Sequence, residues 1–500
     1  MPTIAELLAA GEASSPAIAA LDRPPLTYAG LRSQIEATVA ALNRLGAGRG
    51  DRVAIVLPNG PEMASAFLGV AAGATAAPLN PSYRAEEFEF YLTDLKAKAL
   101  IVEAGATGPA VEVARKLGVA IVELRAGAEA GAFALEGATG AAARPGLAGI
   151  DDIALILHTS GTTSRPKIVP LSHRNISASA RNIANTLAFS PADRGLNVMP
   201  LFHIHGLIAG LTAPLSRGGT VVCTPGFNAL RFFADMKAAK PTWVTAVPTM
   251  HQAILSRAGH NRAVIAENPL RFLRSSSSSM PPQVIGEIEA AFGAPLIEAY
   301  GMTEAAHQMT SNPLNGMRKH GAVGPSAGPE IAIMGEDGSL LGPDEIGEVV
   351  IRGENVMGGY ENNEKANAEA FRNGWFRTGD QGTLDRDGYL RLTGRLKEII
   401  NRGGEKISPR EVDEVLMDHP AVAQVVCFAM PHDKLGEEVA AAVVLREGSA
   451  STEAELRDFV LNRLAPFKAP RKILFLAEIP KGATGKLQRI GLAEKLGLKG

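Results

Sequence analysis

The chain has 500 residues and a formal net charge of −2, and its apolar and charged fractions are 46% and 20%. This composition excludes a disordered or fibrous chain and predicts a large buried core, divided among roughly three domains. The near balance of charges gives no reason to expect nucleic acid or a membrane as a partner. The two cysteines allow at most one disulfide, which favours a reducing compartment. The first residues lack the basic segment and apolar run of a signal peptide, so we expect a cytoplasmic protein. No sequence feature predicts an oligomeric state.

The first part of the chain alternates between helical and strand-like hydrophobic spacing. The expected helices cover 28–45 and 85–95, and the expected strands cover 52–57 and 99–102. Strands that alternate with helices predict a parallel α/β sheet. Residues 103–150 are rich in Ala and Gly, so we expect most of them to form a surface connection, with 119–124 as a further strand candidate.

The same alternation continues to about residue 312. The expected strands are 153–157, 220–222, 242–247 and 295–299, and the expected helices are 173–188, 230–239 and 282–292. Two long uncharged stretches, 63–79 and 196–216, contain many Gly, Ala, Thr, Pro or His residues, so they predict core elements rather than membrane spans. In open α/β sheets the chemistry usually lies at the carboxyl ends of parallel strands.

The pattern changes after about residue 320. Short strand-like runs separated by Gly and Pro (330–334, 347–352, 375–378, 389–393) predict a small β-rich subdomain. Residues 398–500 predict a separate α/β unit, with helices at 409–417, 452–464 and the end, and strands at 422–430, 439–444 and 472–475. The expected fold class is therefore α/β. It comprises a large domain over 1–396, with α/β subdomains at about 1–150 and 151–320 and a β-rich subdomain at about 321–396, followed by a smaller domain over 397–500.

A ten-residue segment rich in hydroxyl groups follows the expected strand at 153–157. It contains five hydroxyl residues, one glycine and two cations, and its candidate ligands are Thr159, Ser160, Gly161, Thr162, Thr163, Arg165 and Lys167. Such a loop offers backbone N–H groups, hydroxyl donors and positive charge, which a polyphosphate requires. It is not a Walker A loop, because the Gly-Lys-Ser/Thr ending is missing. The alternative is a solvated turn before a helix.

Three further positions carry charges that suit nucleotide chemistry. Glu304 follows the strand at 295–299, where a hard oxygen ligand suits Mg²⁺ that carries phosphates, although it could also cap a turn. Asp380 follows a glycine and is expected in a turn. Lys486, in Thr-Gly-Lys, is preceded by flexible glycines that let a point cation reach a site on another domain; the alternative is a solvated lysine.

Five motifs occur in a fixed order, at 159–167, 300–304, 377–380, 394–397 and 480–486. Together they resemble the adenylate-forming family of acyl-CoA synthetases, luciferases and nonribosomal adenylation domains. The resemblance covers nearly the whole chain. It implies ATP and CoA as co-substrates, Mg²⁺ as cofactor, and a small carboxylic acid that is converted to an acyl-adenylate and then to a thioester. It also implies that the C-terminal domain is mobile and swings about a hinge at Lys397.

The resemblance also assigns roles to residues. It implies that Lys486, Thr303 and Glu304 are catalytic and that Glu304 binds the metal. Tyr300 is implied to pack on adenine and Asp380 to bind both ribose hydroxyls. The full implied nucleotide site is Thr159, Ser160, Gly161, Thr162, Thr163, Arg165, Lys167, Ser278, Tyr300, Gly301, Met302, Thr303, Asp380 and Arg395. The implied CoA contacts are Arg402, Gly403 and Gly404.

The candidate acid-binding residues are two histidines and a serine. His203 stands with His205 in an apolar run, Ser277 lies among five consecutive serines after Arg274, and His307 follows the Glu304 motif. A pocket lined by His203, Ser277 and His307 would be small and rich in donors, which suits a short dicarboxylate, whereas a fatty-acid tunnel needs apolar walls. The alternatives are buried structural histidines, a flexible serine loop, and a histidine pair that lacks a third metal ligand.

The wider context, including 312–314 and 401–409, resembles the oxalate–CoA ligase branch of the family. The sequence therefore predicts conversion of oxalate to oxalyl-CoA, with release of AMP and diphosphate. Three alternatives stay open. The acid could be malonate or a medium- or long-chain fatty acid. The chain could be an adenylation module that loads a carrier protein. It could also be a non-catalytic nucleotide-binding relative.

Overall fold

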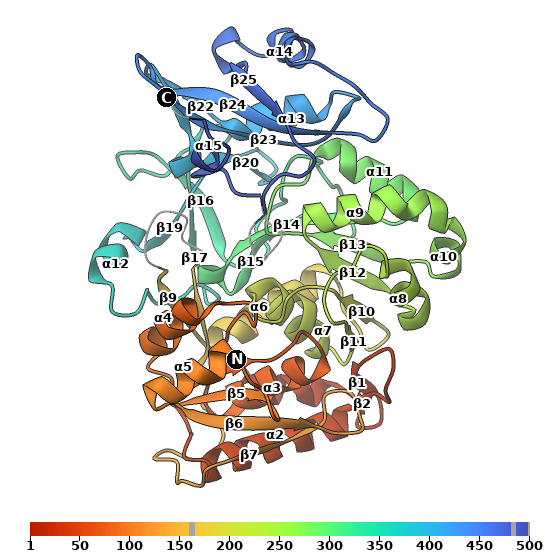
Figure 1. Ribbon diagram of the computed structural model, residues 1–500, viewed down its shortest axis with the longest axis vertical. Coiled ribbons are helices and arrows are strands. Elements are labelled where there is room, and N and C mark those ends of the chain that lie inside the picture. Colours follow the sequence, from red (N-terminus) through yellow and green to blue (C-terminus); the bar gives the residue numbers. More distant parts are fainter. Residues whose placement is uncertain (160–165, 482–486, 499–500) are drawn as a thin grey trace.

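The computed structural model describes residues 1–159, 166–481 and 487–498. Within these residues the strands form four sheets, and the two largest belong to the N-terminal part of the chain (Figure 1). The fold is mixed α/β, as the sequence predicts. The C-terminal unit lies at the upper end of the view in Figure 1, opposite the sheet formed early in the chain.

The first sheet has seven strands and is parallel except at its two edges. Its order is β7 (Phe133–Gly137), β6 (Ala120–Ala126), β5 (Ala99–Glu103), β3 (Arg52–Val56), β4 (Thr75–Pro78), β8 (Ile153–His158) and β9 (Ile168–Ser172). Successive residues of β5 enter different cores, Ile101 on one face and Leu100 on the other. Because both faces are covered, these strands are continuous apolar runs rather than alternating ones.

The second sheet has eight strands and is also mostly parallel. Its order is β15 (His307–Ser311), β14 (Leu296–Met302), β13 (Phe272–Ser275), β12 (Trp243–Ala246), β10 (Arg194–Asn197), β11 (Thr220–Cys223), β1 (Pro16–Ala19) and β2 (Leu26–Thr27). It too is covered on both faces, since Phe272 and Leu273 belong to different cores.

Helices fill the space between the two large sheets and cover their outer faces. The shared core contains α1 (Ile4–Leu7), η1 (Leu8–Ala10), α2 (Tyr28–Arg44), α3 (Pro61–Gly73), α6 (His173–Thr186), η2 (His205–Thr212) and α7 (Ala213–Leu215). The first sheet is covered by α4 (Ala85–Leu95) and α5 (Pro109–Leu117). The second is covered by α8 (Phe232–Ala239), α9 (Pro248–Ala258), α10 (Arg262–Glu267) and α11 (Pro282–Phe292), and η3 (Gly259–Asn261) connects α9 with α10.

The order of the strands differs from the sequence prediction in two respects. Strands β8 and β9 join the first sheet and β1 and β2 join the second, so the strands cross the predicted division near residue 150. Residues 103–150 are not mainly a surface connection, because they contain α5, β6 and β7. Helix α5 is short, and two of its four buried residues are Ala110 and Ala114, so it is hard to recognise in a stretch rich in Ala and Gly.

The two uncharged stretches are core elements, as predicted. The first forms α3 and β4, and the second includes η2 and α7, and almost all of their residues are buried. No helix among the described residues has the length and apolar character needed to cross a bilayer.

The third sheet is the β-rich subdomain, and its longest strand corrects one prediction. It contains β16 (Glu330–Met334), β17 (Gly347–Arg352), β18 (Phe371–Arg372), β19 (Trp375–Leu384) and β20 (Leu390–Arg395), with α12 (Glu364–Ala370) preceding β18. Asp380 was expected in a turn but lies within β19. The pairing of β17 with β19 shifts register next to it, and Gly379 has a φ of +74° there. The Gly-Asp pair therefore marks a bulge rather than a turn.

The fourth sheet and its helices form the C-terminal unit. They are η5 (Leu396–Glu398), β21 (Ile400–Arg402), β22 (Glu405–Ile407), α13 (Pro409–Met417), β23 (Val422–His432), β24 (Gly436–Leu445), α14 (Glu453–Leu461), η6 (Pro466–Lys468), β25 (Lys472–Phe475) and α15 (Leu492–Lys495). Two surface ion pairs reach from this unit to the rest of the chain. Lys406 Nζ lies 3.4 Å from Glu336 Oε1, and Arg446 Nη2 lies 3.7 Å from Glu287 Oε1. Lys397 lies in η5, between β20 and β21.

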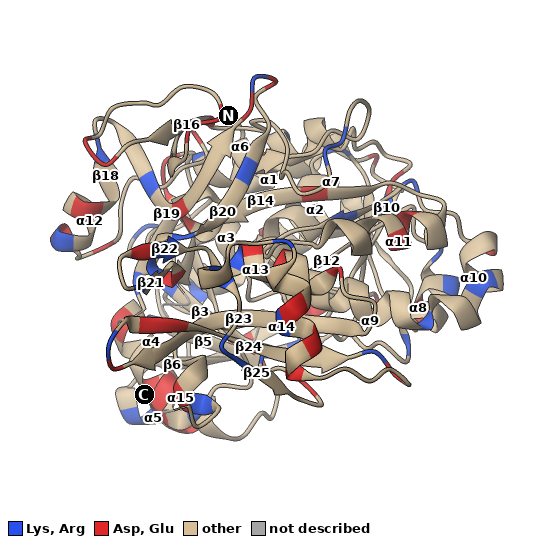
Figure 2. Ribbon diagram, turned by 90° about the horizontal axis from the view of Figure 1, so that it is seen from above, with Lys and Arg blue, Asp and Glu red and all other residues tan. Residues whose placement is uncertain are grey.

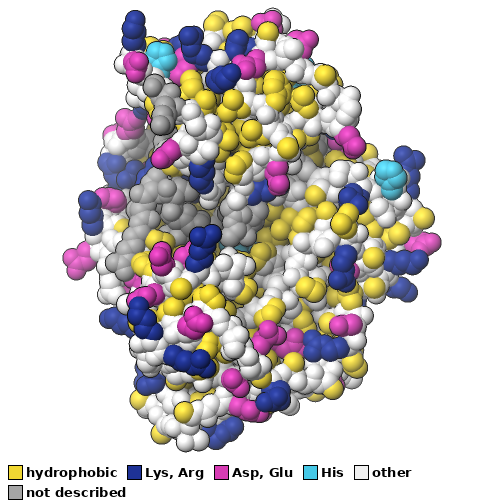
Figure 3. All heavy atoms as spheres, viewed as in Figure 1, with side chains coloured by type: hydrophobic (Ala, Val, Ile, Leu, Met, Phe, Trp, Pro, Cys, Tyr) yellow, Lys and Arg dark blue, Asp and Glu magenta, His cyan; other side chains and the backbone are white. Residues whose placement is uncertain are grey.

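Charged residues of both signs are interspersed along the ribbon in Figure 2. The face drawn in Figure 3 also mixes basic and acidic side chains, with apolar side chains exposed between them. This distribution matches the formal net charge of −2.

The close pairing of β14 with β15 requires glycine at position 301, and this requirement yields a stability prediction. A Cβ placed on Gly301 would overlap the carbonyl oxygen of His307 in the paired strand β15. Gly301→Ala should therefore force the two backbones apart and lower the free energy of unfolding by about 1–3 kcal/mol. The measurement is the urea midpoint followed by circular dichroism.

Gly286→Ala is the matched control. Gly286 lies inside α11, and a Cβ there has open space around it. Alanine favours a helix interior over glycine by about 1 kcal/mol, so this variant should unfold at the same or a higher urea concentration. A Gly301→Ala protein as stable as the wild type would contradict the close approach of β14 and β15.

Candidate active site

The end of β14 meets the β-rich subdomain through the carboxylate of Asp380. Tyr300 Oη donates a hydrogen bond to Asp380 Oδ2 at 2.5 Å, and Arg395 Nε donates to Asp380 Oδ1 at 2.9 Å. Burial, followed by the negative charge of Asp380, raises the pKa of Tyr300 well above its ordinary value, so its hydroxyl stays a donor. A carboxylate has about four lone-pair sites, so Asp380 can still accept further hydrogen bonds from a ligand.

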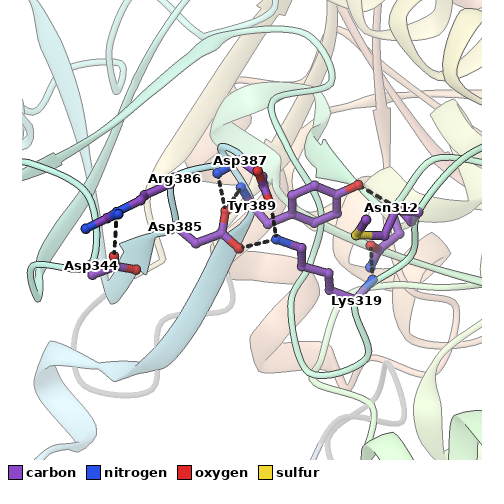
Figure 4. Close-up of polar contacts among 8 residues, drawn as sticks. Asn312, Lys319, Asp344, Asp385, Arg386, Asp387 and Tyr389 are labelled. Carbon is purple, nitrogen blue, oxygen red and sulfur yellow. Dashed lines mark hydrogen bonds and ion pairs between the residues drawn. The ribbon is translucent and has the colours of Figure 1, made fainter.

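The hairpin that carries Asp380 and Arg395 is held by Lys319 (Figure 4). Its ammonium group lies 2.6 Å from Asp385 Oδ2 and 2.7 Å from Asp387 Oδ2, in the turn between β19 and β20. The same ammonium lies 4.4 Å from the centre of the Tyr389 ring. Lys319 belongs to the segment that follows β15, so these contacts tie the hairpin to the end of the second sheet.

Glu304 lies in the short helix η4 (Thr303–Ala305), which directly follows β14. It is 7% exposed, and its Oε1 accepts a hydrogen bond from Tyr360 Oη at 2.8 Å. Lys167 Nζ lies 4.4 Å from the centre of the Tyr360 ring. Burial raises the pKa of Glu304 above its ordinary value, while the Tyr360 hydrogen bond and the positive charges of Arg395 and Lys167 oppose that rise.

The donor set around Glu304 fits Mg²⁺ that arrives with a phosphate chain. The carboxylate is a hard oxygen ligand, and the charge of the metal would offset the cost of burying the anion. No cluster of three or more His, Cys, Asp or Glu side chains that could hold a metal occurs in the described ranges. Glu304 would therefore share the ion with phosphate oxygens and water rather than enclose it in a protein cage.

The hydroxyl-rich loop is described only at its base. Thr159 and Lys167 face each other across it: the Thr159 N–H donates to Lys167 O, and Thr159 Oγ1 accepts from the Lys167 N–H, both at 3.0 Å. The loop connects β8 with β9, an antiparallel strand that the sequence did not predict. The predicted ligands within the loop (Ser160, Gly161, Thr162, Thr163, Arg165) and the predicted catalytic Lys486 lie outside the described residues.

Two of the three predicted acid-binding residues belong to one buried polar cluster. His205 Nδ1 lies 3.1 Å from Ser277 Oγ, and its Nε2 lies 2.7 Å from Thr245 Oγ1. The rings of His205 and His307 stack with their centres 4.8 Å apart. Arg274 Nη1 lies 3.2 Å from His307 Nε2 and 3.4 Å from His205 Nε2. Ser277 and His307 therefore meet through His205 and Arg274.

His203, the third predicted acid-binding residue, lines a small cavity together with Thr303. The volume of this cavity is about 60 Å³, and Asn80, Tyr83 and His158 also line it. A larger hollow of about 630 Å³ is formed by α9, α10 and α11, but no predicted site residue lines it. We therefore locate the candidate site by its chemistry rather than by the size of a cavity.

Strained backbone also occurs at this place. Three non-glycine residues here have positive φ angles, with +77° at Ser277, +46° at Ala306 and +96° at His307. Such conformations cost about 1–3 kcal/mol each and persist only where the surrounding structure holds them. In addition, η2 is a π-helix, and its first residue is His205. Strained backbone and π-helical turns are enriched at functional sites.

The remaining predicted residues lie at separate places. Gly301 and Met302 pair with β15, and Ser278 is exposed. Arg402 Nε lies 2.6 Å from Glu438 Oε1 in the C-terminal unit. Gly403 and Gly404 form the turn between β21 and β22, with φ angles of +59° and +98°.

Sequence reasoning did not assign Tyr360, His205 or Arg274 to the site. Tyr360 follows two glycines in a segment with no motif that was recognised, so the sequence offered little signal. His205 lies two residues after His203, a predicted acid-binding residue, and Arg274 directly precedes the five serines that include Ser277. Their burial within an apolar strand or helix was the available signal, because polar groups in such positions need partners.

Comparisons with known proteins identify the family of the chain. Residues 9–361 match the AMP-binding enzyme family, and residues 411–486 match the AMP-binding enzyme C-terminal domain. The chain is 47% identical over 480 residues to an oxalate–CoA ligase of Arabidopsis thaliana, covering 93% of this chain and 92% of that protein. It is 45% identical over 478 residues to an oxalate–CoA ligase of Saccharomyces cerevisiae, covering 89% and 87%. The ATP-bound crystal structure of MatB from Rhodopseudomonas palustris is similar over 98% of both chains, with a TM-score of 0.88 and 29% identity. The chain belongs to the AMP-binding enzyme family.

Proposed function

We propose that this protein is an AMP-forming acid–CoA ligase that converts oxalate, ATP and CoA to oxalyl-CoA, AMP and diphosphate. The observation that carries the proposal is the convergence of distant segments. The base of the 159–167 loop, the end of β14 and the β19–β20 hairpin meet through direct contacts of Lys167, Tyr360, Glu304, Tyr300 and Asp380. The proposal is supported by 47% identity to a protein named as an oxalate–CoA ligase.

In the first step, a carboxylate oxygen of the acid attacks the α-phosphorus of ATP, and diphosphate leaves. Asp380 would bind the ribose hydroxyls, with Tyr300 and Arg395 fixing its orientation. The loop from Thr159 to Lys167 would hold the phosphate oxygens. Lys486 would neutralise the charge that develops at the α-phosphate, because transfer at phosphorus depends mainly on positioning and electrostatic stabilisation.

Glu304 is the residue that would hold Mg²⁺. Bound Mg²⁺ neutralises phosphate charge and orients the phosphate chain. The carboxylate must be ionised to bind the metal. The hydrogen bond from Tyr360 and the nearby cations favour that ionised form against the effect of burial.

In the second step, the CoA sulfur attacks the carbonyl carbon of the acyl-adenylate, and AMP leaves. Arg402, Gly403 and Gly404 would contact CoA, since two glycines in a turn allow the close approach of a pantetheine arm. The C-terminal unit would rotate about Lys397 between the two steps. Arg402 is paired with Glu438 in this structure. CoA would therefore either displace Glu438 from Arg402 or bind to Arg402 while the ion pair stays intact.

The assignment to a short dianionic acid is supported by the polar cluster and the small cavity. The cavity beside His203 and Thr303 has a volume of about 60 Å³, which is close to that of a few heavy atoms. Ser277, His205 and His307 provide polar groups at a place where a fatty-acid pocket would need apolar ones.

The substrate proposal predicts the order of activity in a panel of acids. Diphosphate release, measured with ATP and CoA, should give the highest kcat/KM for oxalate, a lower value for malonate, and little turnover of medium-chain or aryl acids. The reason is that a longer or apolar acid would leave the buried polar groups without partners. Faster turnover of octanoate or benzoate than of oxalate would overturn the substrate proposal.

A second prediction separates the two half-reactions. Lys486→Ala should slow adenylate formation by roughly 10²–10³-fold, the usual cost of losing one electrostatic contact in a transition state. It should spare the reaction of preformed oxalyl-adenylate with CoA. Lys481→Ala is the matched control, because Lys481 Nζ is engaged with Glu478 Oε1 at 2.8 Å. If adenylate formation by Lys486→Ala equals that of the control, the role of this lysine is wrong.

A third prediction concerns pH. Tyr360→Phe removes a hydrogen bond that lowers the pKa of Glu304, so that pKa should rise further. Glu304 would then be protonated at higher pH, and the acidic limb of the kcat/KM profile for ATP should move to higher pH. Tyr389→Phe is the control, because the Tyr389 hydroxyl donates to Met317 O on the surface. Identical acidic limbs in Tyr360→Phe and Tyr389→Phe would show that Glu304 does not set this limb.

A further inference from the structure

Arg274 is a buried cation in the polar cluster for which no role has been assigned. It lies in β13 and is 0% exposed. Its Nη1 points to His307 Nε2 and His205 Nε2, and its Nη2 donates to Gln308 Oε1 at 3.2 Å. Its Nε has no hydrogen-bond partner within the described part of the chain. All of its polar neighbours are uncharged or imidazole groups.

An arginine in such a place normally pairs with a carboxylate, but no Asp or Glu of the described ranges forms an ion pair with Arg274. Burial alone lowers the pKa of Arg274, to about 9, so the group remains a cation at neutral pH. Arg271, three residues earlier, shows the usual arrangement, with Asp193 Oδ1 at 2.9 Å from its Nε. A buried charge without a counter-ion is costly, and a protein retains one where an anion arrives to compensate it.

The guanidinium also fixes the hydrogens of the two histidines, because it has only donors. His307 Nε2 faces Arg274 Nη1 at 3.2 Å and accepts from it, so this ring carries its hydrogen on Nδ1. The cation 3.4 Å from His205 Nε2 favours a lone pair at that atom too, which places the His205 hydrogen on Nδ1. His205 Nδ1–H then donates to Ser277 Oγ, and Thr245 donates to His205 Nε2. Ser277 consequently keeps its own hydroxyl hydrogen for another acceptor. The positive charge of Arg274 therefore favours an arrangement in which the hydrogens of His205, His307 and Ser277 point away from the guanidinium.

We propose that Arg274 is a positioning residue that determines specificity for acids with a second negative charge. It supplies the buried positive charge behind Ser277 and His307 and orients their donors toward the carboxylate that does not react. This inference rests on the proposed function, because it takes Ser277 and His307 as residues that bind the acid. An acid with a neutral end would leave the cation uncompensated and would bind less tightly.

Oxalate and oxamate provide the matched probes for this proposal. They have the same number of heavy atoms and nearly the same shape, but oxamate carries a neutral amide in place of one carboxylate. The dissociation constant of each acid is measured by calorimetry with a non-hydrolysable ATP analogue and Mg²⁺ present, so that binding is read without turnover. The variants are Arg274→Met, Arg274→Lys and the control Arg271→Met.

The wild type should bind oxalate more tightly than oxamate. Arg274→Met should reduce this preference by about 100-fold, nearly all of it through weaker oxalate binding, because a buried positive charge is lost. Arg274→Lys should recover part of the preference, since it keeps the charge but loses the fork of donors. Arg271→Met should lower the unfolding midpoint and leave the preference unchanged. A merely structural role for Arg274 would instead weaken both acids equally.

If Arg274→Met does not fold, Arg274→Gln gives the same comparison with two donors and no charge. An unchanged preference in a folded, uncharged Arg274 variant would overturn the inference and leave the proposed function intact. A wild type that forms an acyl-CoA from oxamate or acetate more efficiently than from oxalate would overturn both. A wild type that prefers malonate to oxalate would overturn only the choice of oxalate. The role of Arg274 would then be tested with malonate and its monoamide, which has one neutral end, in place of oxalate and oxamate.

Discussion

The carboxylate of Asp380 is the contact on which the rest of the site depends. It accepts from Tyr300, at the end of a strand in the second sheet, and from Arg395, in the neighbouring strand of its own hairpin. The hydrogen bond from Tyr300 joins the second sheet to the β-rich subdomain, whose inward residues Val349 and Phe376 belong to the same core as Tyr300. Because the hairpin is also held by Lys319 at its turn, the carboxylate is fixed from both ends. A ribose-binding group needs this constraint, since a mobile carboxylate would lose much of its hydrogen-bond energy to entropy.

Buried charges of opposite sign flank the place where we propose that the acid reacts. Glu304 is buried beside Tyr360 and Lys167, and Arg274 is buried beside two histidines. A buried charge without a counter-ion is costly, and we propose that each is compensated by a ligand, Mg²⁺ for the carboxylate and a second substrate anion for the guanidinium. The strained backbone at Ser277 and His307 fits the same scheme, because a protein retains strain where function requires a particular geometry.

Much of the fold could be predicted from the sequence, because hydrophobic runs and their spacing are local signals. The helix at Pro282–Phe292 and the strands at Glu330–Met334 and Gly347–Arg352 have the predicted bounds. Pairing between distant strands could not be predicted in this way, and so β8 and β1 join sheets on the other side of the predicted division. Asp380 was placed in a turn because Gly-Asp is a turn signal, and a bulge within a strand has the same local sequence.

The site could be predicted in part for a similar reason. Glu304, Tyr300 and Asp380 belong to motifs, and the structure brings them together with Arg395. Tyr360 and Arg274 belong to no recognised motif, and only three-dimensional contacts reveal them. Their importance comes from burial beside a charge, which depends on packing between segments far apart in the chain.

The most direct measurement is a crystal structure of the protein with a stable analogue of oxalyl-adenylate. The account predicts that the ribose hydroxyls bind Asp380 beside Tyr300, and that the free carboxylate of the acyl group lies against Ser277 and His307, in front of Arg274. An analogue bound elsewhere, or with its ribose away from Asp380, would contradict the claim that these separate segments form one nucleotide site.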